Sequence, residues 1–352
     1  MKNVLTHIFI DGVNGMALGI LCTYALGTIL QQMGLIFTKD IGDYLISLGG
    51  IAILLTGAGI AAGMAAKFAV PPAVALAAIV SGMVGAYADA IFQSSIVVKE
   101  NVVKLSGPGD PFGAFIAALI ALEIGKMISG KTEYDLLVTP LVSAGLGSAA
   151  GFLLAPAMDK VLSYLVQAMD WSMKQSSVIM GILIACLSCI FSLLPISTLA
   201  LFSMAGLKGL AAGAATIGCC CSMIGFAIAS YHDNKVCGLL TLTFGTGKLQ
   251  LANTFKRPYI LLPSLLSSAV LGGIGTGIFK LTNTASGASM GTTGFVGCLS
   301  AYNSMLDDMG SSEALLVVSL LCCILPGALS WVIALGMKKM NILKDGDMKI
   351  SI

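Results

Sequence analysis

The polar side chains that could bind or act on a solute lie within or beside long apolar runs of this chain. Glu123 lies inside the apolar run 112–128, and Lys126 follows one helical turn later on the same face. A carboxylate in surroundings of low dielectric can bind the hydroxyl groups of a polyol, or titrate near neutral pH and carry a proton. Glu123 is therefore a candidate solute ligand or proton carrier, and an internal ion pair with Lys126 is the structural alternative.

Two acidic turns precede apolar runs. Asp11 and Asn14 open the first run, where an acid near the positive end of a helix is also a common interfacial feature. Asp110 lies in the turn Gly107-Pro108-Gly109-Asp110-Pro111, which predicts the start of a helix. The backbone N–H groups of that start could bind an anionic or hydroxylated ligand, and a plain surface turn is the alternative.

One of the two histidines, His232, follows a long apolar segment in the sequence Ser230-Tyr231-His232-Asp233-Asn234. A histidine in a loop is usually solvated. Beside Asp233 and Asn234, however, His232 could bind or protonate a ligand. His232 and Asp233 are therefore included among the candidate ligands.

Two glycine-rich islands carry most of the neutral polar groups. They are residues 245–253 and 286–294, and both are too rich in glycine for stable helices that face lipid. Exposed backbone with serine, threonine, asparagine and glutamine suits a polyol better than a bulky apolar drug. Their candidate ligands are Gln250, Asn253, Ser289, Thr292 and Thr293. The Gly247-Lys248 pair has the wrong glycine spacing for a phosphate-binding loop, and so ATP hydrolysis is not supported.

The cysteines indicate packing more than chemistry. Most of the ten lie in apolar segments, as small buried thiols do. Cys186-x-x-Cys189 has the spacing of a redox or zinc pair, but it lies within an apolar run without histidine or charged ligands beside it. We expect no disulfide, no metal site and no cofactor.

The composition shows which elements must position these groups. Hydrophobic residues make up 57% of the 352 residues and charged residues 10%, which indicates a polytopic membrane protein with lipid as its solvent. We expect one integral membrane transport domain over residues 1–352. The net charge is +2 and Arg257 is the only arginine, which gives a nucleic-acid role almost no support.

The expected fold is all-α, with about ten transmembrane helices, some of them broken helices or re-entrant hairpins. Segments 197–229 and 283–304 could each be a full span, a hairpin or a broken helix. Lysines near the C-terminus place that end in the cytoplasm by the positive-inside rule. The expected apolar segments are 8–36, 44–68, 72–92, 111–130, 137–158, 175–194, 197–229, 236–252, 259–279 and 312–337.

An internal repeat is a further expectation. Pro72 and Pro140 are spaced like Pro195 and Pro263, with a period of about 123 residues. The repeats would cover about 44–158 and 167–281. The sequence leaves open whether the copies are parallel or inverted.

Several segments together carry a family resemblance. They are His7–Gly19, Gly107–Gly113, Gly213–Cys220, Ser289–Gly294 and Gly346–Lys349. In combination they resemble the EIIC-type membrane proteins of the bacterial phosphotransferase system, in the branch that includes PfoR-like regulators. The resemblance covers essentially the whole chain.

The resemblance implies a bacterial inner-membrane permease, a dimer like other EIIC proteins, that translocates a sugar while a separate EIIB protein phosphorylates it. The phosphorylated histidine or cysteine would then be on another protein, and no catalytic residue is transferred to this chain. The short polar segments 93–111 and 159–174 are the expected EIIB docking surfaces. Two alternatives remain, which are an ion-coupled secondary transporter of a small polar solute and a PfoR-like membrane sensor or regulator.

Overall fold

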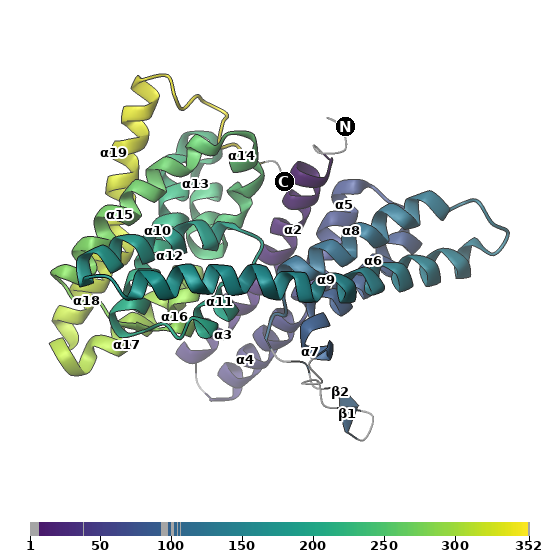
Figure 1. Ribbon diagram of the computed structural model, residues 1–352, viewed down its shortest axis with the longest axis horizontal. Helices are drawn as coiled ribbons and strands as arrows, with labels where there is room; N and C mark the ends of the chain where they lie inside the picture. Colours follow the sequence, from purple (N-terminus) through teal and green to yellow (C-terminus); the bar gives the residue numbers. More distant parts are fainter. Residues whose placement is uncertain are drawn as a thin grey trace. The chain divides into compact units, whose positions relative to one another are not determined.

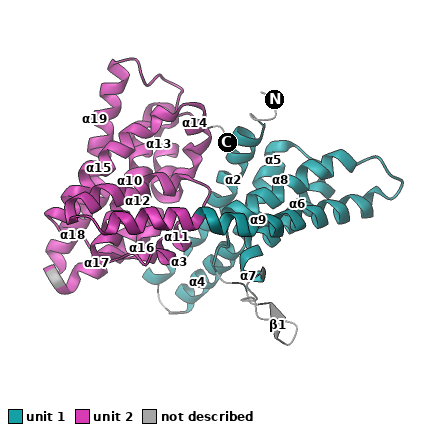
Figure 2. Cartoon of the chain, viewed as in Figure 1, with its two compact units in different colours: residues 1–161, 352 teal, residues 162–351 magenta. Residues whose placement is uncertain are grey.

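The structure of the chain is a computed structural model, and it describes residues 7–37, 39–92, 98–99, 102–103, 105 and 107–350 (Figure 1). The chain forms two compact units, and each is described by itself below (Figure 2). Unit 1 is residues 1–161 with residue 352, and unit 2 is residues 162–351. The boundary falls within one long helix, α9 (Asp135–Met173).

The described residues of unit 1 form helices and two short strands. Its first half holds the π-helical segments η1 (His7–Gly12) and η2 (Leu21–Ala25) with helices α2 (Val13–Ile20), α3 (Leu26–Ile36), α4 (Lys39–Leu54) and α5 (Thr56–Phe68). Its second half holds α6 (Pro72–Ala86), α7 (Ala88–Phe92), the strands β1 (Val98–Lys99) and β2 (Val102–Val103), α8 (Pro111–Ile128) and the first part of α9. The strands pair antiparallel.

Unit 2 contains more interrupted helices. Its first half holds the end of α9 with α10 (Ser177–Leu193), α11 (Thr198–Met204), α12 (Gly209–Ala229), α13 (Tyr231–Leu240), η3 (Thr241–Gly245), η4 (Gly247–Gln250) and α14 (Leu251–Lys256). Its second half holds η5 (Pro258–Leu261), α15 (Leu262–Gly277), β3 (Asn283–Thr284), α16 (Ala285–Met290), η6 (Thr293–Phe295), α17 (Val296–Met309), α18 (Ser311–Ser319), η7 (Leu320–Ile324) and α19 (Leu325–Lys339).

The expectation of an all-helical, polytopic membrane fold is confirmed. Six helical stretches of the described chain are long and apolar enough to cross a membrane, and the pair α4–α5, bent by 59°, would make a seventh. Two shorter apolar helices, α6 and α10, complete the set. The ten expected apolar segments all fall on helices, but 236–252 is divided among four short ones. The expected apolar segments therefore divide, in the described chain, into full spans, one bent pair and shorter or interrupted helices.

Close glycine contacts hold unit 1 together. In α2, a Cβ atom added to Gly15 would lie 2.6 Å from the Met64 Cα of α5, and one added to Gly19 would overlap the Gly59 carbonyl. In the same way, Gly85 of α6 packs against the backbone of Gly113 in α8. The helices thus approach at backbone distance, which is how small residues drive helix association in membranes.

Unit 2 is built around α12. In the most apolar 18-residue segment of this helix, 94% is buried inside the protein. The helix packs against α10, α15 and α19 (Figure 1). A Cβ atom added to Gly213 would overlap the carbonyl oxygen of Leu281, and one added to Gly218 would overlap that of Ala185. The glycines of the Gly213–Cys220 segment are therefore required by backbone contacts on two sides of α12.

Both segments whose form the sequence left open are interrupted, and neither is one continuous helix. Between α11 and α12 the chain makes a turn at 205–206 and is extended at Lys208. Lys208 and Gly209, the first residue of α12, form antiparallel bridges with Thr284 and Asn283. Residues 283–304 likewise divide into β3, α16, η6 and α17. The two breaks thus satisfy part of each other's backbone hydrogen bonding.

Two further expectations concern particular segments. Segment 159–174, expected to be a polar docking surface, is helical as part of α9. Of the other expected docking surface, 93–111, residues 93–97, 100–101, 104 and 106 lie outside the described residues. The single domain and its internal repeat stay predictions.

The substitution Gly213→Ala should lower the free energy of unfolding by about 1–3 kcal/mol, because the added methyl group must push away the Leu281 carbonyl. Gly336→Ala in α19 is the matched control, since a Cβ atom there meets nothing within 4 Å and alanine favours the helix. Thermal unfolding of the purified protein compares the two. Equal midpoints for Gly213→Ala and the native chain would show that α12 is not packed as described.

Candidate functional site

The two glycine-rich islands of the sequence meet in unit 2. The Thr292 hydroxyl donates to the carbonyl oxygen of Thr243 (2.6 Å), and the Thr293 hydroxyl donates to that of Gly245 (2.9 Å). Both threonine side chains are buried. These two candidate ligands therefore hold the interrupted backbone around η3 to the loop before η6.

The second island depends on unusual backbone conformations. Gly291 has φ 52° and ψ −125°, a combination that favours glycine, and a Cβ atom there would lie 2.9 Å from the Cβ of Cys219 in α12. Ser289 is held locally, since its hydroxyl donates to the Ser286 carbonyl (2.8 Å) and its own carbonyl accepts from Thr198 (3.2 Å). The backbone carbonyl groups of this segment can therefore accept hydrogen bonds from side chains.

A buried lysine joins the first island to another break. Lys248 is 9% exposed, and its ammonium group donates to the carbonyl oxygens of Leu194 and Ile196, between α10 and α11. A cation stabilises the carbonyls that the end of a helix leaves without helical partners. The sequence analysis used Lys248 only to reject a phosphate-binding loop. Its position as an ionisable group inside an apolar region was the signal of a site.

Two buried serines border this region. The hydroxyl groups of Ser188 in α10 and Ser222 in α12 are buried. Ser188 has no hydrogen-bond partner in the described part of the chain, and Ser222 has no oxygen or nitrogen partner there but lies beside the thiol of Cys189 in α10. A Cβ atom added to Gly247 would lie 3.4 Å from the Ser222 oxygen, which places that serine against the first island. Neither serine was among the predicted ligands. A buried hydroxyl without a partner is costly, and a bound polar molecule could satisfy it.

We define the broken-helix site as residues 243–248, 289–293, Ser188 and Ser222. It offers hydroxyl groups, backbone carbonyls and one ammonium group, all close to the buried helix α12. Neutral donors and acceptors of this kind suit a hydroxylated solute. The ionisable group among its described residues is Lys248, whose ammonium group is bonded to backbone carbonyls.

Other predicted ligands instead bind the C-terminal tail, which we define as residues 340–350. The Asp233 carboxylate accepts from the backbone N–H groups of Gly346 (2.9 Å) and Met348 (3.2 Å). The Gln250 amide donates to the Met348 carbonyl (2.8 Å), and the Asn253 amide donates to the Lys349 carbonyl (3.0 Å) and to Gln250 (2.8 Å). The structure thus brings these three residues together around the chain's own backbone.

Asp347 anchors this tail. Its side chain is fully buried and forms an ion pair with Arg257, and it accepts from the Tyr259 hydroxyl (3.0 Å) and the Lys344 backbone N–H (3.0 Å). A buried carboxylate needs such a set of partners. The chain's single arginine and the Gly346–Lys349 segment therefore serve to dock the tail.

His232 lies at the edge of the tail and is 63% exposed. Its Nδ1 atom is 3.4 Å from a carboxylate oxygen of Asp345, which in turn accepts from Lys338 (2.8 Å). The hydrogen bond and charge of Lys338, followed by the charge of His232, hold the pKa of Asp345 below its usual value. His232 is therefore part of an exposed charge cluster in unit 2.

The remaining predicted ligands belong to unit 1. Asp110 caps α8, because its carboxylate accepts from the Gly113 backbone N–H (2.7 Å), as the helix-start interpretation of this turn implies. Asp11 and Asn14 lie in η1 and α2 and are half-buried. The Asp11 carboxylate lies 3.7 Å from His7 Nδ1, one turn earlier.

Glu123 takes part in a larger cluster than its sequence neighbours suggested. The pair with Lys126 is present (3.6 Å), but the Nε2 atom of His7 is closer to the same oxygen (3.1 Å). The His7 ring stacks on the Phe68 ring, with the two ring centres 3.9 Å apart. The Lys126 ammonium lies 4.4 Å from the centre of the Phe68 ring. The cluster is partly exposed, and His7 was not among the predicted ligands.

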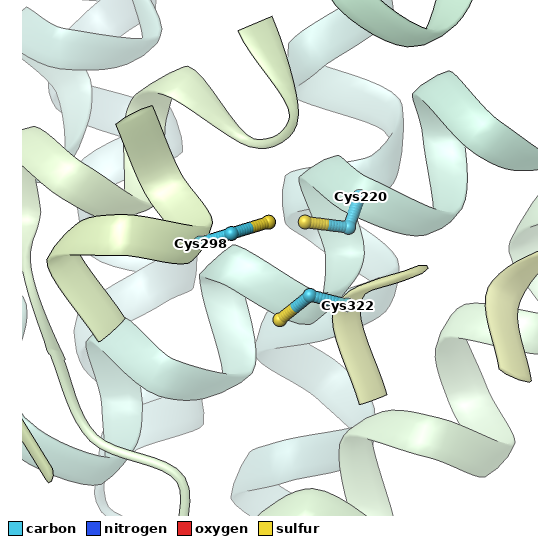
Figure 3. A group of neighbouring side chains, drawn as sticks. All are labelled: Cys220, Cys298 and Cys322. Carbon is cyan, nitrogen blue, oxygen red and sulfur yellow. The ribbon is translucent and has the colours of Figure 1, made fainter. Parts of the chain in front are cut away.

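Three cysteines form a buried group in unit 2. Cys220 of α12, Cys298 of α17 and Cys322 of η7 have sulfur atoms within 4.8 Å of one another, and the side chains of Cys220 and Cys298 point toward each other (Figure 3). Apolar side chains such as Leu271 and Met305 enclose them. All ten cysteines are free. Their burial among apolar side chains is typical of thiols that contribute to packing.

Comparison with protein families matches residues 10–350 to the family described as Phosphotransferase system, EIIC. No curated protein matches the chain. The resemblance inferred from the sequence is thereby confirmed over nearly the whole chain, whereas the PfoR-like branch stays a prediction.

Replacing Arg257 by methionine should release the tail, because Asp347 would keep its buried carboxylate without the cation. We expect a loss of about 1–3 kcal/mol, at the lower end because Arg257 is itself 46% exposed. Hydrogen exchange of the tail amides and thermal unfolding measure the two effects. The double variant Arg257→Met with Asp347→Leu should recover part of the stability, and unchanged amide protection in Arg257→Met would contradict the anchor.

The contact between Asp345 and Lys338 should depend on pH in a defined direction. Because the pKa of Asp345 is lower in the folded chain, the contact stabilises the docked tail above the unfolded value of about 3.9 and is lost as the pH falls through the lowered pKa. Hydrogen exchange, corrected for intrinsic rates, compares the native chain with Asp345→Asn. The native tail should be better protected at pH 7 and pH 5, and the difference should shrink below about pH 4 and vanish once the pH is below the lowered pKa of Asp345. A difference that persists in acid would overturn this assignment.

Proposed function

This chain belongs to the EIIC family of the phosphotransferase system, and from that membership we propose a finer function. The chain is a permease that translocates a sugar or a related polar solute across the membrane, and a separate EIIB protein phosphorylates that solute. The chain belongs to a family of membrane transport components, and its helices supply the multi-pass architecture.

The broken-helix site carries the proposal. The hydroxyl groups of Thr292 and Thr293 donate to backbone carbonyls of the interrupted segment around η3. The ammonium group of Lys248 donates to carbonyls in the interruption between α10 and α11. Non-helical backbone at membrane depth is tolerated only where it is enclosed by protein or lines a cavity, and transporters form their solute sites from such half-helices. The buried hydroxyls of Ser188 and Ser222 would bind hydroxyl groups of the solute there.

In this function the chain contributes positioning. Holding a sugar hydroxyl in line with the phosphoryl group of EIIB lowers the barrier by orientation, and the covalent phosphate intermediate stays on the partner. The C-terminal lysines, including Lys338 and Lys349, favour a cytoplasmic tail. A homodimer in the bacterial inner membrane is part of the same proposal.

One observation favours the alternative of an ion-coupled transporter. Glu123 and His7 lie 3.1 Å apart in unit 1 with Lys126 beside them, and such a set could pass a proton during transport. In that case the solute would enter unmodified. Sensing without transport is the third function that the experiment below must separate.

Substitution of Ser222 by alanine should weaken solute binding while leaving the fold intact, because within the described chain this hydroxyl has no oxygen or nitrogen partner and lies only beside the weakly bonding thiol of Cys189. Ser230→Ala is the matched control, since Ser230 is also buried, also unpartnered among the described residues, and about 12 Å farther along α12. Thermal stabilisation by a panel of sugars and polyols is the measurement. A ligand at 100 times its Kd stabilises by about 2.7 kcal/mol, and losing one hydrogen bond weakens binding about fivefold.

Uptake into membrane vesicles then separates the mechanisms. Product recovered as a sugar phosphate, only with phosphoenolpyruvate and the soluble phosphotransferase proteins, supports the proposal. Proton-driven uptake of unmodified solute that is lost in Glu123→Gln supports ion coupling. Binding without any uptake supports a sensor, and equal effects of Ser222→Ala and Ser230→Ala would remove the broken-helix site from the argument.

A further inference from the structure

A groove of about 710 Å³ opens in unit 2 beside α12, α13 and α19. Its walls are apolar over most of its length, with Ile224 and Ile228 on α12 and Gly327, Trp331 and Leu335 on α19. Trp331 is 55% exposed, although it lies in a helix apolar enough to span the membrane. The groove therefore lies on a surface whose solvent would be lipid.

Gly327 keeps the groove open. A Cβ atom added there would lie 3.4 Å from side-chain carbons of both Ile224 and Ile228. Ala328 and Ala334 also line the groove with small side chains. The width of the groove between α12 and α19 therefore depends on the small side chains of α19.

The groove is long enough for an acyl chain. Its lining follows the end of η7 and then α19, from Ile324 to Lys338, which corresponds to about 21 Å at the helical rise. One leaflet of the hydrocarbon core is about 15 Å deep. A lipid chain could therefore lie along the whole apolar part and place its headgroup at the far end.

That far end is basic. His232, Lys235 and Lys338 line it, and the described lining residues include no carboxylate. From the tail side, Asp345 accepts from Lys338 (2.8 Å) and lies 3.4 Å from His232, while Asp233 lies 3.8 Å from His232. A carboxylate oxygen of Asp345 thus already stands where an anionic oxygen of a headgroup would bind Lys338.

The backbone of Lys235 is a second observation at the same end. Its φ of 54° and ψ of −153° interrupt α13, in a region that side-chain-bearing residues rarely adopt. Such a conformation costs free energy and persists only where the surrounding fold imposes it. The result is a lysine side chain held at the mouth of the groove.

We propose that this groove binds a phospholipid with an anionic headgroup. One acyl chain lies between α12 and α19, and the phosphate group contacts Lys235 and Lys338. The site is separate from the broken-helix site and does not depend on which solute is transported. Because Asp345 and the headgroup share Lys338, removal of the Asp345 charge should strengthen lipid binding.

Quenching of Trp331 fluorescence by brominated lipids tests the proposal. The chain has two tryptophans, so the background variant is Trp171→Phe, and the protein is reconstituted in phosphatidylcholine with small added fractions of dibromo-phosphatidylglycerol or dibromo-phosphatidylcholine. We expect phosphatidylglycerol to quench at much lower mole fractions. Lys235→Gln and Lys338→Gln should each reduce that preference about fivefold, as expected for one basic residue near an anionic headgroup. Asp345→Asn should increase it.

Trp331→Phe, which leaves only Trp171, is the matched control and should be quenched equally by both lipids. Gly327→Leu should fill the groove and remove the preferential quenching, and thermal unfolding confirms that this variant is folded. Equal quenching of Trp331 by the two lipids, or a preference that survives both lysine substitutions, would overturn the proposal. Absence of quenching by either lipid would also overturn it and would indicate that a second copy of the chain covers the groove.

Discussion

The structure depends on one constraint, which is that an interrupted helix in a membrane must find partners for its backbone polar groups within the protein. Unit 2 meets it by placing its breaks against one another. The stretch before α12 bridges to β3, Thr292 and Thr293 bond to carbonyls of the η3 region, and Lys248 bonds to carbonyls after α10. Each break is stable only because another is present, so the polar centre of this unit is a cooperative feature.

The close packing of α12 makes this arrangement possible. Gly213 and Gly218 let carbonyl oxygens of Leu281 and Ala185 approach the helix at distances that any side chain would prevent. Helices packed at backbone distance leave little apolar space between them. Unpaired backbone polar groups are then available only where the chain departs from helical geometry. The two glycine-rich islands lie at such positions.

Composition and apolar periodicity were sufficient to predict a polytopic helical protein and to locate both islands, because glycine combined with serine and threonine in an apolar chain indicates backbone that leaves the helix inside the protein. The contacts between the islands could not be predicted, since they depend on how α12 packs. Asp233, Gln250 and Asn253 have the polar groups expected of ligands, but a sequence does not say whether their partner is a solute or the chain's own tail. His7 was undervalued because its partner, Glu123, is far away in the sequence.

The buried polar groups of unit 2 therefore fall into two classes with different meanings. Asp233, Gln250, Asn253 and Asp347 already have partners in the tail, so their polarity is accounted for by folding. Ser188 and Ser222 are equally buried, but among the described residues neither hydroxyl has an oxygen or nitrogen partner, and Ser222 has only the thiol of Cys189 beside it. The hydroxyl groups of Ser230 and Ser264 are also buried without a partner among the described residues, so a missing partner alone does not mark a site. Ser222 differs from them because it lies against Gly247 of the first island, and this contact is the reason why the proposed solute site is placed there.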